Sequence, residues 1–391
     1  MYSGLEGSPR MGFRFFQPKE IICQICGSKS VEISEFLGIC GDCIREDPPS
    51  SLPFIKMAHK EARMPYGLPA DPPKTPNGIK CNFCSNECSL GENEVGYCGI
   101  RRNENGRFTK VGTEYALYHA YLDSHVTNCC AAWFCPAGTG NGYPKYAYRE
   151  GPEQGFSNLA VFCYGCNFNC LFCQNASHKE LPKHMMNIED FVKVVRKNEQ
   201  ISCICFFGGS PEPQLPFALN ASKRVLELKK KILRICWEWN GCGNSSFVKK
   251  AAQLSLETGG NIKFDLKAAT PSLSLALSAV DNTKAFENFE MIAKEFYNER
   301  PNLPLLMAST LLVPGYVSAA EVEQIALFIS EINPDIPYSL LAFYPAFKMM
   351  DLPPTSKTQA SECYHIAKTY LNRVNVGNLH ILGIKAQNEL L

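Results

Sequence analysis

The segment "YGCNFNCLFCQN", residues 164–175, brings three cysteines close together in the chain. Cys166, Cys170 and Cys173 are separated by three and then two residues, and Phe172 directly precedes the last of them. Thiolates are the protein ligands of iron–sulfur clusters, and three of them on a four-iron cluster leave one iron without a protein ligand. An open position is what a catalytic metal requires. The spacing therefore predicts a catalytic cluster rather than a closed structural one.

A group of four cysteines near the N-terminus has a different pattern. Cys23 and Cys26 form one CxxC pair, and Cys40 and Cys43 form a second pair after thirteen further residues. Each pair can place two thiolates on one tetrahedral ion, so we expect a single four-thiolate site for Zn or mononuclear Fe, with free structural thiols as the alternative. Its simplest role is to staple a segment too small to bury a core; binding of a partner or of nucleic acid is the alternative.

Two further groups of cysteines follow the Pro-rich segment 64–78. The first supplies four thiols for a second metal site of Zn or mononuclear Fe, namely Cys81, Cys84, Cys88 and Cys98. The second lies in the Gly-rich loop "TNCCAAWFCPAGTGNG" and comprises Cys129, Cys130 and Cys135. Adjacent cysteines rarely both bind one metal, and free cysteines pack well as small apolar side chains. Metal binding and simple packing therefore both remain open for this loop.

The composition is that of a globular, intracellular chain. Of 391 residues, 45% are hydrophobic and 20% are charged, and the net charge is +1. This balance excludes a disordered chain and makes nucleic acid an unfavourable partner, because binders of nucleic acid usually present a basic face. No signal peptide and no apolar segment of spanning length is evident, so we expect a cytoplasmic protein without a membrane partner. Twenty cysteines in a reducing compartment favour metal binding over disulfides.

From residue 157 onward, apolar runs alternate with amphipathic segments. Predicted strands lie at 157–165, 201–209, 232–241, 261–267, 303–313 and 336–345, and helices fall between them. One helix begins after the cap Asn187, and another begins with a capping box of Ser318 and Glu321. Repeated strand–helix units predict a parallel sheet, which either curves into a partial (β/α) barrel or lies open as a doubly wound sheet.

Chemistry in such a sheet belongs at the carboxyl ends of the strands. The unusual residues of this chain all fall there. The cysteine loop follows the first strand, and later strands end at Gly208, Gly209, Glu212, Asn240, Asp265 and Lys267. Because the carboxyl ends of parallel strands share one rim, these side chains are predicted to form a single site.

The CxxxCxxC loop with Phe172 resembles the signature of the radical S-adenosylmethionine superfamily. The resemblance implies a partial (β/α)6 TIM-like barrel whose cluster, held by Cys166, Cys170 and Cys173, binds and cleaves S-adenosylmethionine. "FFGGSPEP" resembles the glycine-rich strand end that approaches the cofactor, and "FDLK" resembles the ribose-binding and carboxylate-binding segment of glycyl-radical enzyme activases. The implied cofactor-binding residues are Phe172, Gly208, Gly209, Glu212, Asn240, Asp265 and Lys267. Cys163 offers a competing register but is expected to be structural.

The resemblance to the activase-like family covers roughly residues 80–380. The N-terminal four-cysteine ribbon, the second cysteine set, the "TNCCAAWFCPAGTG" loop and the single barrel together further resemble one narrower family, methanogenesis marker protein ten. The resemblance implies cobalamin-dependent C-methylation of an arginine in the alpha subunit of methyl-coenzyme M reductase, with an electron donor as a second partner. The usual D-x-H-x-x-G cobalamin motif is missing, since "DSHVTN" ends in Asn128. No cobalt ligand can be named. The alternatives are an activase of another enzyme and an inactive scaffold built around the four-cysteine ribbon.

The predicted domain plan follows the cysteines. Residues 1–60 form a ribbon-like metal site, residues 61–155 form a Cys-rich segment and loop, residues 156–314 form the barrel, and residues 315–391 form its end and a C-terminal cap that would hold cobalamin.

Overall fold

A mostly parallel, eight-stranded sheet organises the chain. The computed structural model describes residues 19–228 and 231–390. The strand order is β16-β15-β14-β13-β12-β11-β9-β8, and every neighbouring pair is parallel except β8 with β9. The strands are β8 (Tyr118–Ser124), β9 (Ser157–Cys163), β11 (Ile201–Gly208), β12 (Arg234–Trp239), β13 (Ile262–Asp265), β14 (Leu306–Leu312), β15 (Tyr338–Ala342) and β16 (Val374–Gly377).

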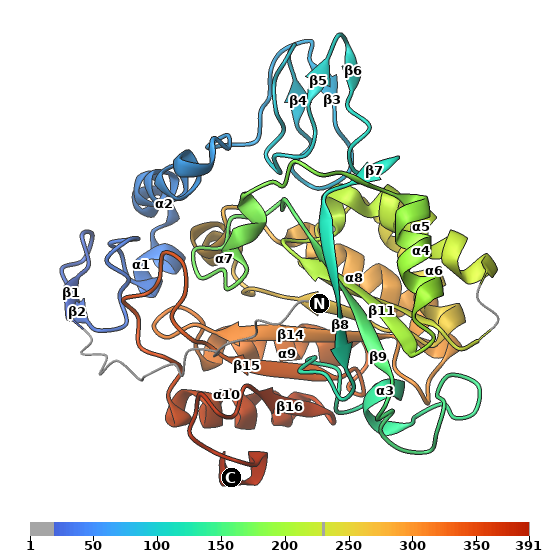
Figure 1. Cartoon of the computed structure of the whole chain (residues 1–391). Helices are drawn as coiled ribbons and strands as arrows, with labels where there is room; N and C mark the ends of the chain where they lie inside the picture. The colour runs from blue at the N-terminus through green and yellow to red at the C-terminus, as the bar shows by residue number, and fades with distance from the viewer. Residues whose placement is uncertain (1–18, 229–230, 391) are drawn as a thin grey trace, which may run out of the picture.

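The helices between the strands all cover one face of this sheet (Figure 1). Consecutive helices pack side by side in chain order: α4 (Ile188–Lys197), α5 (Leu215–Leu228), α6 (Ser245–Thr258), α8 (Thr283–Phe296), α9 (Ala319–Ile332) and α10 (Lys357–Tyr370). In a doubly wound sheet the helices would divide between two faces. The single helical layer therefore decides for the partial barrel over the open, doubly wound alternative.

Apolar side chains of the strands fill the space beneath these helices. Phe206 of β11 stacks on Trp237 of β12, with ring centroids 4.8 Å apart. Trp237 lies beside Trp239, and Phe264 of β13 packs edge-on against Trp239. Because side chains alternate along a strand, the neighbours of these residues point to the concave inner face, where the chemistry lies.

The C-terminal region continues the barrel wall. β15 falls within the predicted sixth strand 336–345, and α10 and β16, which the sequence did not predict, extend the sheet by a further parallel unit. The sequence also did not predict α7 (Pro271–Ser278) or the antiparallel edge strand β8. Among the described residues, no helix is both long enough and apolar enough to cross a membrane.

Two predicted helix caps have different outcomes. Asn187 caps α4, and its side chain accepts a hydrogen bond from the Asp190 amide at 2.9 Å. Ser318 stands at the cap of α9, but its side chain makes no cap bond, so the predicted capping box is wrong. Glu321 instead accepts hydrogen bonds from the amides of Ala269 and Thr270, because the α7 segment packs against the start of α9.

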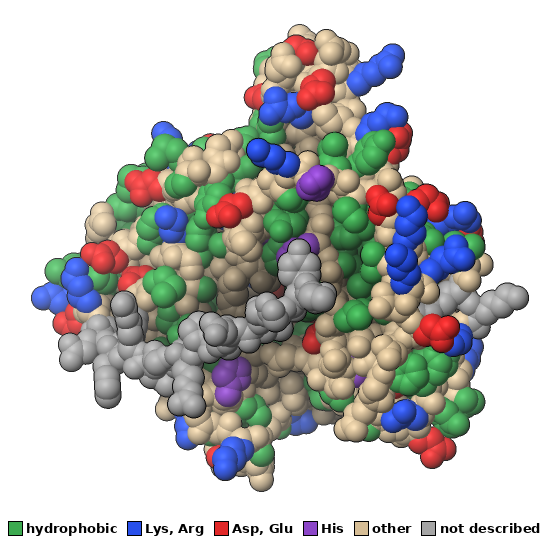
Figure 2. Space-filling model, viewed as in Figure 1, with side chains coloured by type: hydrophobic (Ala, Val, Ile, Leu, Met, Phe, Trp, Pro, Cys, Tyr) green, Lys and Arg blue, Asp and Glu red, His purple; other side chains and the backbone are tan. Residues whose placement is uncertain are grey.

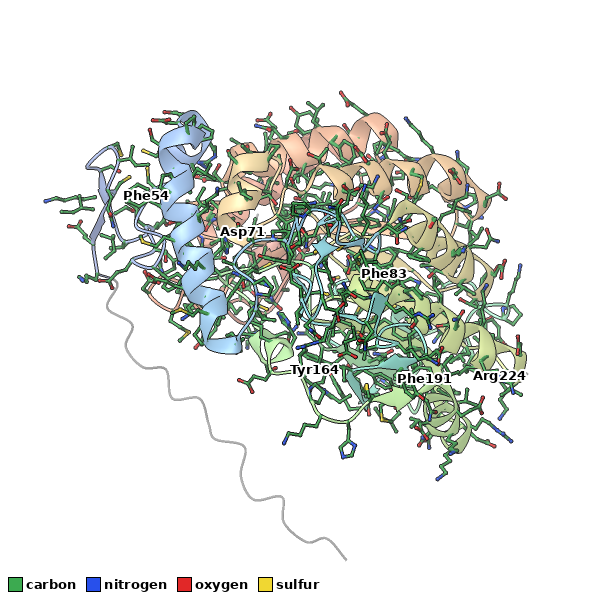
Figure 3. All side chains as sticks on the ribbon, turned by 90° about the horizontal axis from the view of Figure 1, so that it is seen from above. Phe54, Asp71, Phe83, Tyr164, Phe191 and Arg224 are labelled. Atoms are coloured by element: carbon green, nitrogen blue, oxygen red, sulfur yellow. The ribbon has the colours of Figure 1, made fainter. Side chains whose placement is uncertain are left out.

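The N-terminal residues form two additions to the barrel. β1 (Ile21–Ile22), β2 (Lys29–Ser30), α1 (Gly41–Glu46) and α2 (Pro48–Arg63) make the first, and α2 lies beside the barrel when viewed from above (Figure 3). The second consists of two short hairpins that rise over the barrel in Figure 1, built from β3 (Ile79–Lys80), β4 (Ser89–Leu90), β5 (Asn103–Glu104) and β6 (Arg107–Phe108). β7 (Tyr115–Ala116) pairs with β10 (Met186–Asn187) and leads into β8.

Candidate functional site

The loop after β9 carries the three predicted cluster cysteines at the carboxyl rim of the sheet. The Phe168 amide donates to the Cys166 sulfur at 3.3 Å, and this sulfur lies 3.2 Å from the Gly209 carbonyl oxygen. The Cys170 sulfur lies 3.3 Å from the Ser278 hydroxyl oxygen at the end of α7. Contacts from β11 and α7 therefore fix where two of the thiols point.

The three thiols line one pocket with nearly all of the other predicted site residues. From the predicted set, the lining contains Cys166, Cys170, Phe172, Cys173, Gly208, Gly209, Asn240, Asp265 and Lys267. The pocket is also lined by His178, Ser210, Glu238, Leu341 and Asn378, which the sequence did not single out. The face drawn in Figure 2 is hollowed near its centre, and positive and negative side chains alternate around it rather than forming one basic stripe.

The two glycines at the end of β11 are required by the close approach of the cluster loop. A Cβ on Gly209 would lie 2.2 Å from the Gly165 carbonyl oxygen. Gly208 has a φ of +106°, and a Cβ there would lie 2.8 Å from the Cys163 amide nitrogen. Real Cβ atoms do not approach backbone this closely, so only glycine lets the two strand ends meet.

Asn240 and Glu212 hold the rim together. Asn240 donates to Asn167 in the cluster loop at 2.8 Å and to the Ser210 hydroxyl at 3.1 Å. Glu212 lies outside the pocket lining and is fully buried; it accepts hydrogen bonds from the Ser210 hydroxyl and from the Gly241 amide. Burial raises the pKa of Glu212 to about 7. Glu212 therefore lies in the turn behind the site and does not line the pocket where it was predicted to contact the cofactor.

Buried positive charges surround the cluster thiols. Burial raises the pKa of Cys173 to about 11 and that of Cys166 further still. Burial also lowers the pKa of Lys179, and the neighbouring thiols Cys173 and Cys166 oppose this effect. The Lys179 ammonium is buried without a hydrogen-bond partner among the described residues. An environment that disfavours free thiolates and holds an unpaired ammonium fits an anionic metal cluster bound by these sulfurs.

Asp265 and Lys267 form an ion pair at the end of β13. The Lys267 ammonium contacts Asp265 Oδ2 and lies 5.6 Å from the ring centroid of Phe172. Burial lowers the pKa of Lys267, but the carboxylate of Asp265 outweighs this effect and the pKa lies above its ordinary value. The other oxygen, Asp265 Oδ1, is buried and has no hydrogen-bond partner within residues 19–228 and 231–390. This free acceptor faces a pocket where a bound hydroxyl or ammonium group could donate to it.

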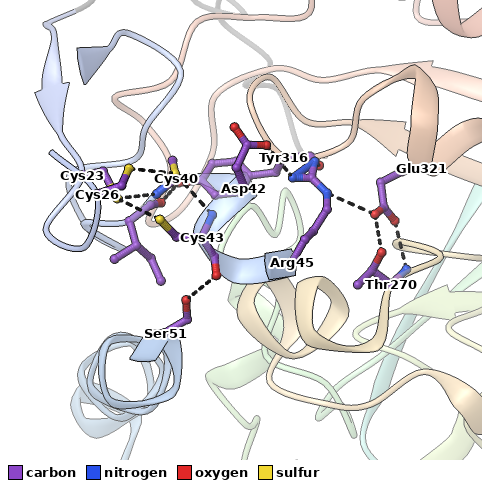
Figure 4. A network of polar contacts seen from close by, with 11 residues as sticks. Cys23, Cys26, Cys40, Asp42, Cys43, Arg45, Ser51, Thr270, Tyr316 and Glu321 are labelled. Atoms are coloured by element: carbon purple, nitrogen blue, oxygen red, sulfur yellow. Dashed lines mark hydrogen bonds and ion pairs between the residues drawn. The ribbon is translucent and has the colours of Figure 1, made fainter. Parts of the chain in front are cut away.

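The four N-terminal cysteines come together as predicted (Figure 4). All four sulfurs, from Cys23, Cys26, Cys40 and Cys43, lie within 4.8 Å of one another, a spacing that fits one tetrahedral ion. Helix α1 begins at Gly41, is capped by Cys40 and carries Cys43. Arg45 of α1 donates to the Tyr316 carbonyl at 2.8 Å and pairs with Glu321, so this site is fastened to the barrel.

The second predicted set of cysteines is spaced more widely. In the part of the chain that the structure describes, no three sulfurs of Cys81, Cys84, Cys88 and Cys98 lie within 4.8 Å of one another, and the cluster cysteines share this wider spacing. The Asn86 side chain of this segment donates to the Asn167 carbonyl in the cluster loop at 2.7 Å. The hairpin addition is therefore attached directly to the loop that carries the cluster thiols.

Comparisons with known proteins agree with this site. A model of the radical SAM superfamily matches residues 160–329. The Methanocaldococcus jannaschii protein MJ1632, provisionally named a glycyl-radical enzyme activating enzyme, is 26% identical over 56% of this chain and 79% of its own length. MJ0808 of the same organism, an uncharacterized protein, is 22% identical over 78% of this chain and 82% of its own length.

A solved structure of Streptococcus suis SuiB, bound to the precursor peptide SuiA, also aligns with the chain. It is 13% identical over 58% of this chain, with a TM-score of 0.44. The aligned part spans about half of the SuiB chain, at 51%.

Proposed function

We propose that this protein, whose residues 160–329 match the model of the radical SAM superfamily, is an enzyme that modifies another protein by radical chemistry. The observation that carries the proposal is the rim pocket, in which three cysteines of one loop meet the glycine end of β11 and the free oxygen of Asp265. When bound, the cluster and S-adenosylmethionine supply the one-electron chemistry that removes a hydrogen atom from an unactivated carbon.

The residues of the chain then have separate tasks. The sulfurs of Cys166, Cys170 and Cys173 would hold the cluster, and Lys179 would balance its negative charge. Gly208 and Gly209 leave the backbone of β11 open to the cofactor, and Asp265 Oδ1 could accept a hydrogen bond from it. The barrel wall excludes water from the reacting groups.

The first candidate modification is C-methylation of an arginine side chain in the alpha subunit of methyl-coenzyme M reductase, with cobalamin as methyl carrier. It is supported by the resemblance of the cysteine groups and the barrel to methanogenesis marker protein ten. The region that this resemblance assigns to cobalamin contributes β15, α10 and β16 to the sheet. The described residues of this region do not form a separate corrinoid domain.

The second candidate is activation of another enzyme by installing a radical without methyl transfer. The similarity to MJ1632, which spans 79% of that protein, favours it. The C-terminal region also favours the second candidate, because it forms part of the barrel wall and leaves the rim pocket itself as the reactive site.

The test is anaerobic reconstitution of the full chain with iron, sulfide and hydroxocobalamin, followed by incubation with S-adenosylmethionine and a reductant. Cleavage to 5′-deoxyadenosine is expected from the wild type and from Cys163→Ala, but not from Cys170→Ala. Cys163 is the matched control because it lies on the adjacent strand end, buried and outside the pocket lining. Equal cleavage by Cys170→Ala would overturn the radical assignment.

The same incubation separates the two candidate modifications. Corrinoid retained after desalting, together with a methyl group on carbon of an arginine peptide from the reductase, supports the methyltransferase. Cleavage without retained corrinoid or methyl gain, and a stable radical signal in a partner enzyme, supports the activase and rejects the methyltransferase.

A further inference from the structure

A second pocket of about 220 Å³ lies inside the barrel, next to the rim pocket and nearer the amino ends of the strands. On each of three strands, one inward-facing residue lines the inner pocket and the next inward-facing residue lines the rim pocket. These successive residues are Cys205 and Phe207 on β11, Cys236 and Glu238 on β12, and Lys263 and Asp265 on β13. Phe207 and Glu238 line both pockets, so the two spaces share a wall.

Thiols dominate this inner pocket. Its lining includes five cysteines from three strands or loops, namely Cys129, Cys135, Cys203, Cys205 and Cys236. The sequence had left Cys129, Cys130 and Cys135 open between metal binding and packing. The structure brings the loop that carries them into the same space as the strand cysteines.

The loop is held firmly against the barrel floor. The Trp133 indole donates to the Cys130 carbonyl at 3.0 Å and to the Ser339 hydroxyl of β15 at 3.1 Å. Ala131 and Phe134 are buried against Met307 of β14. These contacts fix the backbone from Cys130 to Phe134 and so restrict where the adjacent Cys129 and Cys130 sulfurs can lie.

The sulfurs of Cys129 and Cys130 and a carboxylate oxygen of Glu238 all lie within 4.8 Å of one another. The Lys263 ammonium stands beside them, 3.3 Å from the Cys129 sulfur, 3.1 Å from the Cys205 sulfur and 3.5 Å from Glu238 Oε2. The Lys263 side chain is only 2% exposed. A buried ammonium at this place requires negative charge next to it.

We propose that Cys129, Cys130 and Glu238 bind one soft divalent transition-metal ion, with zinc or ferrous iron as the chemical class. Two thiolates and a carboxylate are ligands that such ions accept, and three protein ligands leave a fourth position open, as in catalytic sites. The ion with these ligands carries one net negative charge, which the Lys263 ammonium neutralises. The negative charge of the ion and its ligands thus explains why Lys263 is buried among cysteines.

Two of the three ligands, Cys129 and Glu238, line the inner pocket, so a group bound at the fourth position would be reached from that pocket. Glu238 belongs to both pocket linings, so a group bound to this ion would lie on the path between the barrel floor and the cluster. The proposal does not depend on which protein modification the enzyme makes, because the site is built entirely from side chains below the rim.

Cobalt(II) titration of the full chain tests the site, because cobalt bound to thiolates gives intense charge-transfer absorption. The wild type and Cys129→Ser/Cys130→Ser are reduced, stripped of metal and titrated anaerobically. The wild type is expected to bind one more equivalent of cobalt than the double variant. The double variant should show correspondingly weaker charge-transfer absorption. Equal stoichiometry and equal spectra would overturn the proposal.

Two further variants make the result specific. Cys135→Ser changes a thiol that lines the same pocket but lies outside the ligand group, and it is expected to bind as much cobalt as the wild type. Glu238→Gln is expected to keep the thiolate bands while weakening binding at least tenfold. Loss of cobalt in Cys135→Ser as well would assign the effect to general disruption, and unchanged affinity in Glu238→Gln would remove the carboxylate from the site. Far-ultraviolet circular dichroism of each variant confirms the fold.

Discussion

His59 of α2 and Asn169 of the cluster loop are joined by a hydrogen bond of 2.9 Å between His59 Nδ1 and Asn169 Nδ2. His59 Nε2 lies 3.0 Å from the carbonyl oxygens of both Leu275 and Ala276, so Nε2 carries the proton and Nδ1 accepts from the asparagine. The helix that follows the four-cysteine site therefore supports the loop between Cys166 and Cys170.

Replacing His59 by alanine is expected to destabilise the protein by about 1–3 kcal/mol, because the amide of Asn169 and two carbonyls lose their buried partner. Denaturant unfolding measures this change, and iron content after reconstitution should fall with it. Lys60→Ala, on the exposed side of the same helix, is the control. A His59 variant as stable as the control, with full iron content, would contradict the support role.

Stability should depend on pH through buried neutral histidines. Burial lowers the pKa of His59 to about 4, aided by the charges of Arg63 and Lys179, and burial lowers that of His125 to about 4. The unfolded chain binds protons near pH 6.5 while the folded chain does not, so the stabilisation is complete above pH 6.5 and is lost as the pH falls toward 4.

For His59 the loss over this range is roughly 3 kcal/mol. Unfolding free energies measured from pH 7.5 to 5 should decline, and the decline should be shallower in His59→Gln. A pH-independent free energy over this interval would show that His59 and His125 titrate in the folded protein as they do in the unfolded chain.

Gly209→Ala should disable the site. The new Cβ would meet the Gly165 carbonyl oxygen at 2.2 Å, which forces β11 and the cluster loop apart at a cost of about 1–3 kcal/mol. Loss of bound iron and of S-adenosylmethionine cleavage is expected. Gly151→Ala, where a Cβ meets nothing within 4 Å, should behave as the wild type. If both variants retain full activity, the close approach at Gly209 is not needed.

Tyr316→Phe should loosen the four-cysteine site. The Tyr316 hydroxyl accepts from the Ser34 amide and donates to the Ile39 carbonyl, each at 3.0 Å, and the side chain is fully buried. Removing the hydroxyl is expected to lower the free energy of unfolding by about 1–3 kcal/mol and to speed removal of the metal by a chelator. Tyr344→Phe, at an exposed tyrosine, serves as the comparison. Equal chelation rates would argue that Tyr316 does not hold the site.

The sequence predicted the rim of the site well because spacing and strand ends are local properties. Cys166, Gly209 and Asp265 follow directly from where apolar strands stop, and parallel pairing then brings them together. Glu212 could not be placed in the same way, because whether it faces the pocket or the turn depends on Ser210 and Gly241.

Contacts between distant segments were beyond local patterns. The sequence pattern predicts Glu321 to be a capping-box residue, but its carboxylate accepts hydrogen bonds from the amides of Ala269 and Thr270. No sequence pattern near either segment predicts this contact. The inner pocket is a similar case, since Cys129 and Lys263 are far apart in the chain and meet only when the loop closes the barrel floor.

The cluster loop is held from outside at two alternate residues, by Asn86 at the Asn167 carbonyl and by His59 at the Asn169 side chain. Neither contact involves the thiols, so these two restraints on the backbone between Cys166 and Cys170 do not require iron. Oxygen that strips the iron would then leave a preformed cradle, and repair of a damaged enzyme would need only new iron and sulfide rather than refolding.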